Sequence, residues 1–167
     1  MIEKYTISAN LYNYQQGTPT AFKYLDASGQ EVPVSEIAPW YITDYIPIDV
    51  DTNTITLSMI GGGAPAMCAY DSNKDFLSGV QYNTGSAINK QPITITANEN
   101  IKYIRFSYFL GNSGYDDLAT KMLNAGDSAL PFEPYGNIWK NYTPSQYNGA
   151  AFVIATGQPE QYNGGWS

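Results

Sequence analysis

The sequence has no histidine and one cysteine, and charged residues make up only 14% of its 167 residues. Without histidine the chain cannot form a Ser-His or Cys-His nucleophile pair, and most zinc sites are excluded. The single cysteine excludes an intrachain disulfide. Because Cys68 lies in the apolar run 66–70, we expect it to be buried as a small hydrophobic side chain.

Long apolar runs and clustered basic residues are also missing. No stretch of about 18 consecutive apolar residues occurs, and the N-terminal residues lack the apolar segment of a signal peptide. The formal net charge is -7, and the eight basic residues are scattered along the chain. We therefore expect that the protein does not bind nucleic acid or an anionic membrane surface. We also expect no insertion into a membrane.

What the sequence does have is tyrosine, with 15 residues, together with abundant Gly, Asn, Thr and Ser. Short apolar or alternating segments recur about every 10 residues, separated by turn residues, which predicts about nine strands and an all-β protein. The expected strands include residues 5–8, 21–25, 40–48, 54–60, 66–70, 76–82, 93–96 and 101–109. The architecture we predict is a jelly-roll-type two-sheet sandwich with one short helix and a C-terminal arm or hairpin.

The strand at 101–109 divides its residues between two faces. One face is predicted to be a core face, with Ile104, Phe106 and Tyr108. The other carries Tyr103, Ser107 and Arg105, which is the only arginine of the chain. The short helix is predicted at 116–124, where apolar residues have helical spacing and Gly126 follows as a stop signal.

The composition changes after Gly136, so we divide the chain into a β-sandwich at 1–136 and an extension at 137–167. The extension repeats a Pro-x-Gln-Tyr-Asn-Gly unit at 144–149 and 159–164, with an apolar run at 150–156 between the copies. Asn-Gly favours tight turns, so a terminal hairpin is one interpretation. An arm that packs on a neighbouring subunit is the other.

Several segments of residues 10–136 occur in an order that resembles one family. The most specific are Tyr-Ile-Pro-Ile at 45–48, Tyr-Asp-Ser-Asn-Lys at 70–74, Lys-Tyr-Ile-Arg-Phe-Ser at 102–107 and Leu-Pro-Phe-Glu-Pro-Tyr-Gly at 130–136. They resemble the carbohydrate-binding-module-like β-sandwich domains of bacteriophage tail fibres, baseplate appendages and minor structural proteins. The resemblance implies a virion protein, assembled in the bacterial cytoplasm, that attaches to host-surface glycans without catalysis.

The expected partners are a host-surface saccharide, other virion proteins and further copies of the chain, with a trimer as one form of the homo-oligomer. Two alternatives stay open: a structural virion component, such as a decoration or adaptor protein, and a polysaccharide depolymerase. We expect no catalytic residues and no cofactor. Candidate acids for cleavage exist, but most lie in turns or at the expected helix start. They are Asp71, Asp75, Asp116, Asp117 and Glu133.

Sugar recognition requires flat aromatic rings beside planar hydrogen-bonding groups. The candidate saccharide-binding residues are Trp40, Tyr41, Tyr103 and Arg105. Aromatic residues of the extension are candidate interface anchors, because Tyr and Trp dominate protein contacts. They are Trp139, Tyr142, Tyr162 and Trp166. Asp71, Asn73 and Asp75 have metal-like spacing, so calcium is an alternative there, with an ordinary Asx turn as the competing interpretation.

Overall fold

The computed structural model describes residues 5–36, 38–60, 66–82, 91–110 and 118–139. Apart from one 3-10 turn, the regular secondary structure of these residues consists of antiparallel strands, which confirms the all-β prediction. The strands are β1 (Tyr5–Ile7), β2 (Thr20–Ala21), β3 (Lys23–Leu25), β4 (Glu31–Pro33), β5 (Trp40–Ile42), β6 (Ile46–Pro47), β7 (Thr54–Ile60), β8 (Ala66–Tyr70), β9 (Phe76–Gln81), β10 (Gln91–Thr96), β11 (Tyr103–Phe109), β12 (Leu123–Ala125) and β13 (Asn137–Trp139).

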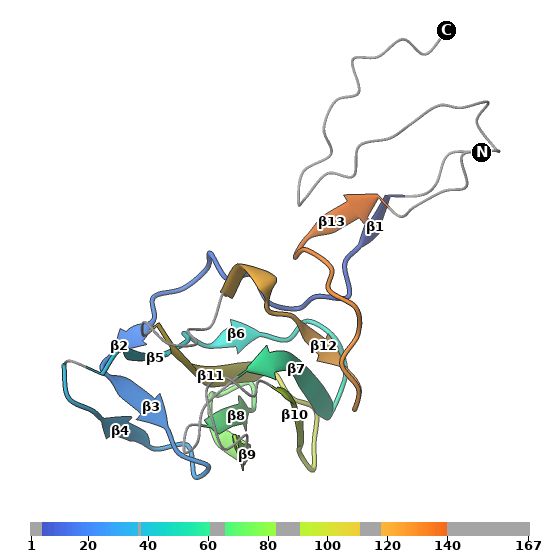
Figure 1. Cartoon of the computed structure of the whole chain (residues 1–167). Coiled ribbons are helices and arrows are strands. Elements are labelled where there is room, and N and C mark those ends of the chain that lie inside the picture. Colours follow the sequence, from blue (N-terminus) through green and yellow to red (C-terminus); the bar gives the residue numbers. More distant parts are fainter. Residues whose placement is uncertain (1–4, 37, 61–65, 83–90, 111–117, 140–167) are drawn as a thin grey trace, which may run out of the picture.

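Two sheets pack face to face to form the sandwich (Figure 1). One sheet has the order β10-β7-β12. The other has the order β2-β5-β11-β8-β9, and β6 also pairs with β11. The strand at 101–109 is therefore an inner strand, with β5 and β6 along one edge and β8 along the other.

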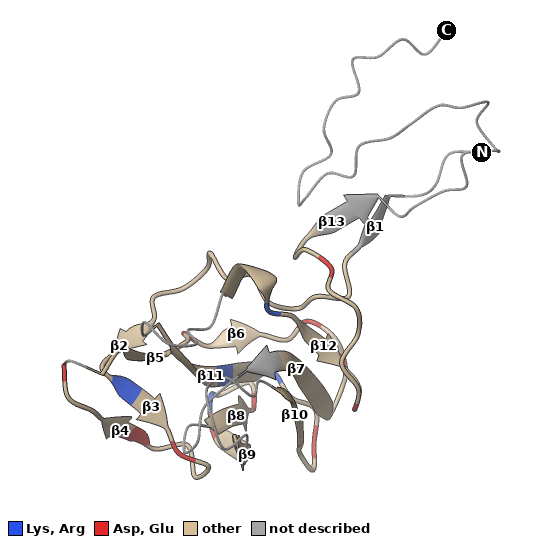
Figure 2. Ribbon diagram, viewed as in Figure 1, with Lys and Arg blue, Asp and Glu red and all other residues tan. Residues whose placement is uncertain are grey.

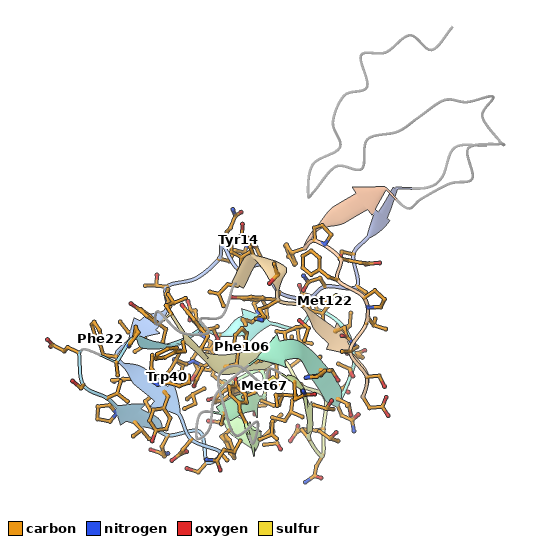
Figure 3. The ribbon with its side chains drawn as sticks, viewed as in Figure 1. Tyr14, Phe22, Trp40, Met67, Phe106 and Met122 are labelled. Atoms are coloured by element: carbon orange, nitrogen blue, oxygen red, sulfur yellow. The ribbon has the colours of Figure 1, made fainter. Side chains whose placement is uncertain are left out.

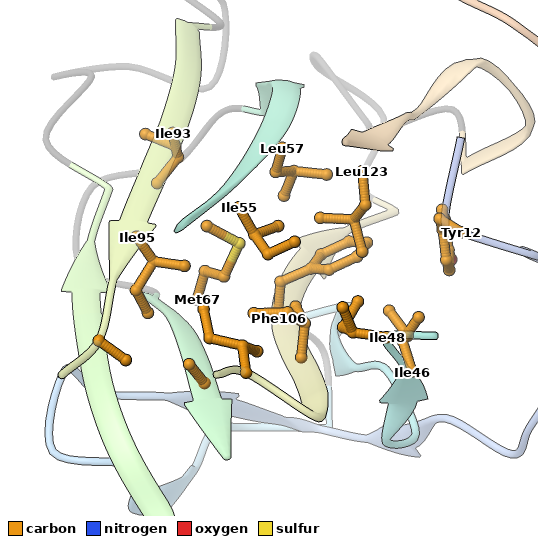
Figure 4. Close-up of a cluster of buried hydrophobic side chains, with 14 of the residues drawn as sticks. Tyr12, Ile46, Ile48, Ile55, Leu57, Met67, Ile93, Ile95, Phe106 and Leu123 are labelled. Atoms are coloured by element: carbon orange, nitrogen blue, oxygen red, sulfur yellow. The ribbon is translucent and has the colours of Figure 1, made fainter. Parts of the chain in front are cut away.

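Apolar side chains from both sheets fill the space between them (Figure 4). Ile55 and Leu57 of β7 face Met67 of β8 and Phe106 of β11, as the alternation of each strand predicts. On the outer face of the smaller sheet, Thr56 pairs with Thr94 through a hydroxyl hydrogen bond of 2.8 Å. Hydrophobic burial on one face and cross-strand pairing on the other thus stabilise the same sheet.

The outer face of the larger sheet is also buried, which the sequence does not predict. The hairpin β3–β4 covers it and forms a second core, whose buried residues are Leu25, Ile42, Ala66, Cys68 and Tyr70. Cys68 is completely buried, as expected, and burial raises the pKa of its thiol to about 12. Both faces of β8 and β11 are therefore packed against other residues.

The hairpin approaches the sheet closely enough for backbone contacts. The Leu25 amide donates to Ser107 Oγ at 2.8 Å, and the Cys68 thiol donates to the carbonyl of Asp26 at 3.4 Å. At Gly79 of β9, an added Cβ would meet the carbonyl oxygen of Ala27. Glycine is required at this position by close approach rather than by its backbone angles.

Two hairpin turns share one construction. In each, an aspartate Oδ1 accepts two backbone amides: Asp26 accepts those of Ser28 at 2.8 Å and Gln30 at 3.0 Å, and Asp71 accepts those of Asn73 at 2.8 Å and Asp75 at 2.9 Å. Both turns also contain a residue with positive φ. Gly29 has φ +83, and Lys74 occupies the equivalent place in the second turn with φ 66.

The helix prediction at 116–124 is wrong. Residues 118–120 form a single 3-10 turn, η1 (Leu118–Thr120), and β12 begins at Leu123. Two of the apolar residues that suggested a helix, Met122 and Leu123, are buried instead where the chain pairs with β7, and Leu123 lies opposite Leu57. Gly126 has φ +103 and follows a strand rather than a helix. Asp116 and Asp117 lie outside the described residues.

The first three residues of the C-terminal extension pair with the N-terminal strand. β13 lies antiparallel to β1, with Thr6 opposite Ile138, and Figure 1 shows this pair set apart from the two packed sheets. The repeats at 144–149 and 159–164 and the apolar run at 150–156 lie outside the described residues.

We expect Gly79→Ala to lower the free energy of unfolding by about 2–3 kcal/mol, because its methyl group would force the hairpin away from the sheet. Gly126→Ala is the matched control, since nothing lies within 4 Å of an added Cβ there. The control should cost only the left-handed backbone strain of about 1 kcal/mol. Equal losses in urea unfolding of the two variants would contradict close packing at Gly79.

Candidate functional site

A pocket of about 240 Å³ opens between the connection from β1 to β2 and the connection from β5 to β6. Five tyrosines, two side-chain amides and one carboxylate supply most of its chemistry. These residues are Tyr12, Tyr14, Tyr45, Tyr108, Tyr135, Asn13, Gln16 and Asp44. The remaining lining residues are Leu11, Gly17, Pro19, Thr43, Ile46, Pro47 and Leu118.

The buried wall of the pocket is continuous with the core of the sandwich. Tyr12 and Tyr108 are almost fully buried, and the ring of Tyr12 packs edge-on against Phe106 at 5.3 Å. Burial raises the pKa of Tyr12 well above the usual tyrosine range and raises that of Tyr108 to about 12. Both phenols are therefore neutral near pH 7, with a hydroxyl that donates and accepts hydrogen bonds.

The outer rim is an exposed aromatic surface. The Tyr14 side chain is 45% exposed and Tyr135 is 41% exposed, and Figure 3 shows Tyr14 projecting away from the packed sheets. A turn holds the segment in place, because Asn13 Oδ1 accepts the Gln15 amide at 3.1 Å and the Asn13 carbonyl accepts the Gln16 amide at 3.1 Å. Exposed rings on an ordered backbone give a ligand flat apolar faces to stack on.

Asp44 connects the two walls of the pocket. Its Oδ1 accepts the Tyr45 amide at 2.8 Å, and its Oδ2 accepts the Thr18 amide from the opposite connection at 3.3 Å. Gly17, with φ +83, lies against the Asp44 side chain so closely that an added Cβ would overlap it. The carboxylate is thus positioned by two hydrogen bonds, and about half of its lone pairs are left for other donors.

Arg105 contacts two residues that line this pocket, Tyr45 and Thr43, and is not on an open surface. It is 7% exposed, its Nη1 donates to Glu31 Oε1 at 3.0 Å, and its Nε donates to the Thr43 carbonyl at 3.1 Å. The guanidinium also lies 4.7 Å from the centre of the Tyr45 ring. Arg105 therefore acts on the pocket through Tyr45 and Thr43, which line it.

Tyr103 is brought close to the pocket, although it does not line it. Its ring packs edge-on against Tyr45 at 5.9 Å, and Lys74 Nζ lies 5.5 Å from the Tyr103 ring and 4.8 Å from the Tyr45 ring. Tyr41 packs behind the buried wall, stacked on Tyr108 at 5.5 Å.

Trp40 belongs to a separate, half-buried aromatic cluster with Tyr24 and Phe109. Its ring lies 5.1 Å from that of Phe109, and Figure 3 shows Phe22 and Trp40 at the opposite side of the molecule from Met122. The four predicted saccharide-binding residues are therefore divided between two places, and none of them lines the pocket.

The candidate calcium ligands lie in the second hairpin turn, where Asp71 Oδ1 already accepts two backbone amides. Among the residues that the structure describes, no group of three or more acidic or cysteine side chains could hold a metal ion. Of the candidate acids, Glu133 accepts the Ala9 amide at 2.8 Å and the Ser8 hydroxyl at 3.3 Å. It therefore fastens the N-terminal segment to the chain that leads into β13.

The predicted interface residues fall largely outside the described part of the chain. The backbone of Trp139 ends β13, and Tyr142, Tyr162 and Trp166 lie beyond it. Their role as anchors stays a prediction.

Sequence reasoning missed the pocket itself. The signal for it was the segment 8–22, in which tyrosine, asparagine and glutamine occur without a single charged residue. That pattern is also typical of a loop. The segment is far in the sequence from residues 43–47, so the sequence alone did not indicate that the two form one pocket.

Comparisons with protein-family models, with curated proteins and with solved structures find no match. In the part of the chain that the structure describes, no helix is long and apolar enough to cross a membrane.

Glu31 makes stability depend on pH. The hydrogen bond from Lys23, followed by that from Arg105, holds the pKa of Glu31 below its usual value. The carboxylate therefore stabilises the fold above its unfolded-state pKa of about 4.3, and this contribution is lost as the pH falls through the lower folded-state pKa. We expect Glu31→Gln to be less stable than the unmodified protein at pH 7, with the difference shrinking below about pH 4.

Urea unfolding of both proteins between pH 7 and pH 3 measures this difference. Asp51→Asn is the control, because Asp51 pairs with Lys102 on the surface, with 86% of its side chain exposed. Such a pair is worth about 0–1 kcal/mol. A stability difference for Glu31→Gln that stays constant with pH would contradict the assignment.

Proposed function

We propose that this protein is a non-enzymatic virion appendage protein of a bacteriophage that binds a host-surface saccharide in the tyrosine-lined pocket. The pocket is the observation that carries the proposal. It combines exposed rings at Tyr14 and Tyr135 with planar amides at Asn13 and Gln16 and the carboxylate of Asp44. Rings suit the C-H faces of a sugar, and the polar groups suit its hydroxyls.

The phage context rests on the resemblance of the sequence segments, and the all-β fold is compatible with it. The composition of the pocket favours binding over cleavage. Asp44 is the one carboxylate among its lining residues, whereas the usual mechanisms of glycoside hydrolysis use a pair of carboxyl groups. A single small site binds weakly, so useful attachment requires several copies acting together on an oligomeric appendage.

We expect Tyr14→Ala to weaken binding to a host-polysaccharide array by about tenfold, which corresponds to about 1.4 kcal/mol. The fold should be unaffected, since the Tyr14 ring is exposed. Trp40→Ala is the matched control: it removes an aromatic ring of the separate cluster, and we expect binding to remain near that of the unmodified protein. Unfolding midpoints of both variants show whether each remains folded.

The reverse result, loss with Trp40→Ala and none with Tyr14→Ala, would move the site to the predicted Trp40 and Tyr41 surface. Binding by neither the unmodified protein nor its assembled form to any saccharide of the host would contradict the proposal.

A structural virion component is the second candidate, and an exposed apolar strip favours it. The strip consists of Leu130 and Phe132, on the segment that leads into β13, and their side chains are 45% and 50% exposed. Exposed large apolar side chains this close together in the sequence are candidates for protein contacts.

We expect the double variant Leu130→Ser, Phe132→Ser to keep the fold and saccharide binding if the strip serves only for assembly. Incorporation into virus particles should fall severalfold, measured by quantifying the protein in purified particles. Unchanged incorporation would contradict an assembly role for the strip.

A further inference from the structure

The pocket is small for a binding site. Its volume is about 240 Å³, whereas sites for drug-sized ligands occupy roughly 300–1,000 Å³. If a saccharide binds there, as the proposed function requires, the pocket accommodates one sugar unit and leaves the rest of the polymer outside.

The charge of the residues that line the pocket is negative only. It contains the carboxylate of Asp44 and no lysine or arginine. One wall comes from the connection between β1 and β2, and Figure 2 shows this connection without any charged residue. None of the described residues that line the pocket offers an ion pair to an acidic ligand.

The basic side chains of the described residues are engaged elsewhere. Lys23 and Arg105 both pair with Glu31, and Lys102 pairs with Asp51. Lys121 is buried and has a partner of its own.

Among the residues that the structure describes, Lys74 is the remaining basic side chain. It lies against the Tyr45 ring and is therefore the cation to test beside the pocket.

We infer that the pocket binds an uncharged sugar unit and discriminates against acidic ones such as uronic acids. Asp44 already accepts the Tyr45 and Thr18 amides, and its remaining lone pairs accept sugar hydroxyls as charge-assisted hydrogen bonds. A ligand carboxylate would be repelled by Asp44 and would lose hydration without gaining a cation. At a separation of about 5 Å and an effective dielectric between those of protein surface and water, the repulsion is worth on the order of tenfold in affinity.

The experiment uses the full-length assembled protein and an array of matched sugars. The pairs are glucose and glucuronic acid, galactose and galacturonic acid, and N-acetylglucosamine and N-acetylmuramic acid, each displayed at equal density. We expect at least one neutral sugar to bind and its acidic counterpart to bind about tenfold more weakly or not at all. The difference should shrink in high salt, because Asp44 is exposed to solvent.

Two variants test whether Asp44 causes the discrimination between neutral and acidic sugars. Asp44→Asn keeps an oxygen that accepts the Tyr45 amide but removes the charge, and we expect it to bring the acidic sugar to within about threefold of the neutral one. Lys74→Met should leave the discrimination unchanged.

An acidic sugar that binds as tightly as its neutral counterpart, or whose binding is lost with Lys74→Met, would overturn the inference. Preserved discrimination in Asp44→Asn would also overturn it. Binding to none of the sugars and to no host polymer would remove the proposed function, and this inference with it.

Discussion

The buried guanidinium of Arg105 is the interaction on which the arrangement of this protein depends. A buried cation is costly unless it is paired and hydrogen-bonded, and Arg105 satisfies this need with partners from separate parts of the chain. Glu31 belongs to the covering hairpin, and Thr43 and Tyr45 belong to the connection between β5 and β6. The single arginine therefore fixes the hairpin to one face of the sandwich and the pocket wall to its edge.

The pocket follows from this arrangement together with the packing of the opposite face of β11. Side chains alternate along the strand, so Phe106 and Tyr108 enter the core between the sheets while Arg105 enters the second core. Tyr108 reaches the pocket from the first core, and Tyr45, held by Arg105, reaches it from the other side. A rigid scaffold thus positions rings at a site whose outer wall is a loop.

Much of the fold was predictable because strand alternation is a local property. β7 and β8 have the predicted bounds. The second core was not predictable, because it depends on the hairpin β3–β4 folding over β8 and β9, where Ala27 meets Gly79 of β9, a contact between residues far apart in the sequence. The expected helix failed for a related reason: the apolar spacing of 118–123 also suits a turn that leads into a strand, and pairing with β7 decided between them.

The site was less predictable than the fold because a tyrosine has the same appearance in a sequence whether its ring is packed or open. The sequence predicted that Arg105 and Tyr103 lie on a solvent-facing side of β11, opposite the core face. The hairpin β3–β4 covers this side of the sheet, so it is interior as well. Tyr14 was not among the predicted binding residues, because nothing in its loop segment marked it as a site, yet its ring is exposed. The distinguishing property is charge. The segment has no charged residue, yet its backbone amides at Gln15 and Thr18 donate to the side chains of Asn13 and Asp44, which hold it in place. Its rings and amides are therefore presented without the competing hydration of ionic groups. The sequence feature that marks this pocket is therefore an uncharged loop rich in tyrosine and amide side chains, whereas the only arginine of the sequence marks a buried ion pair.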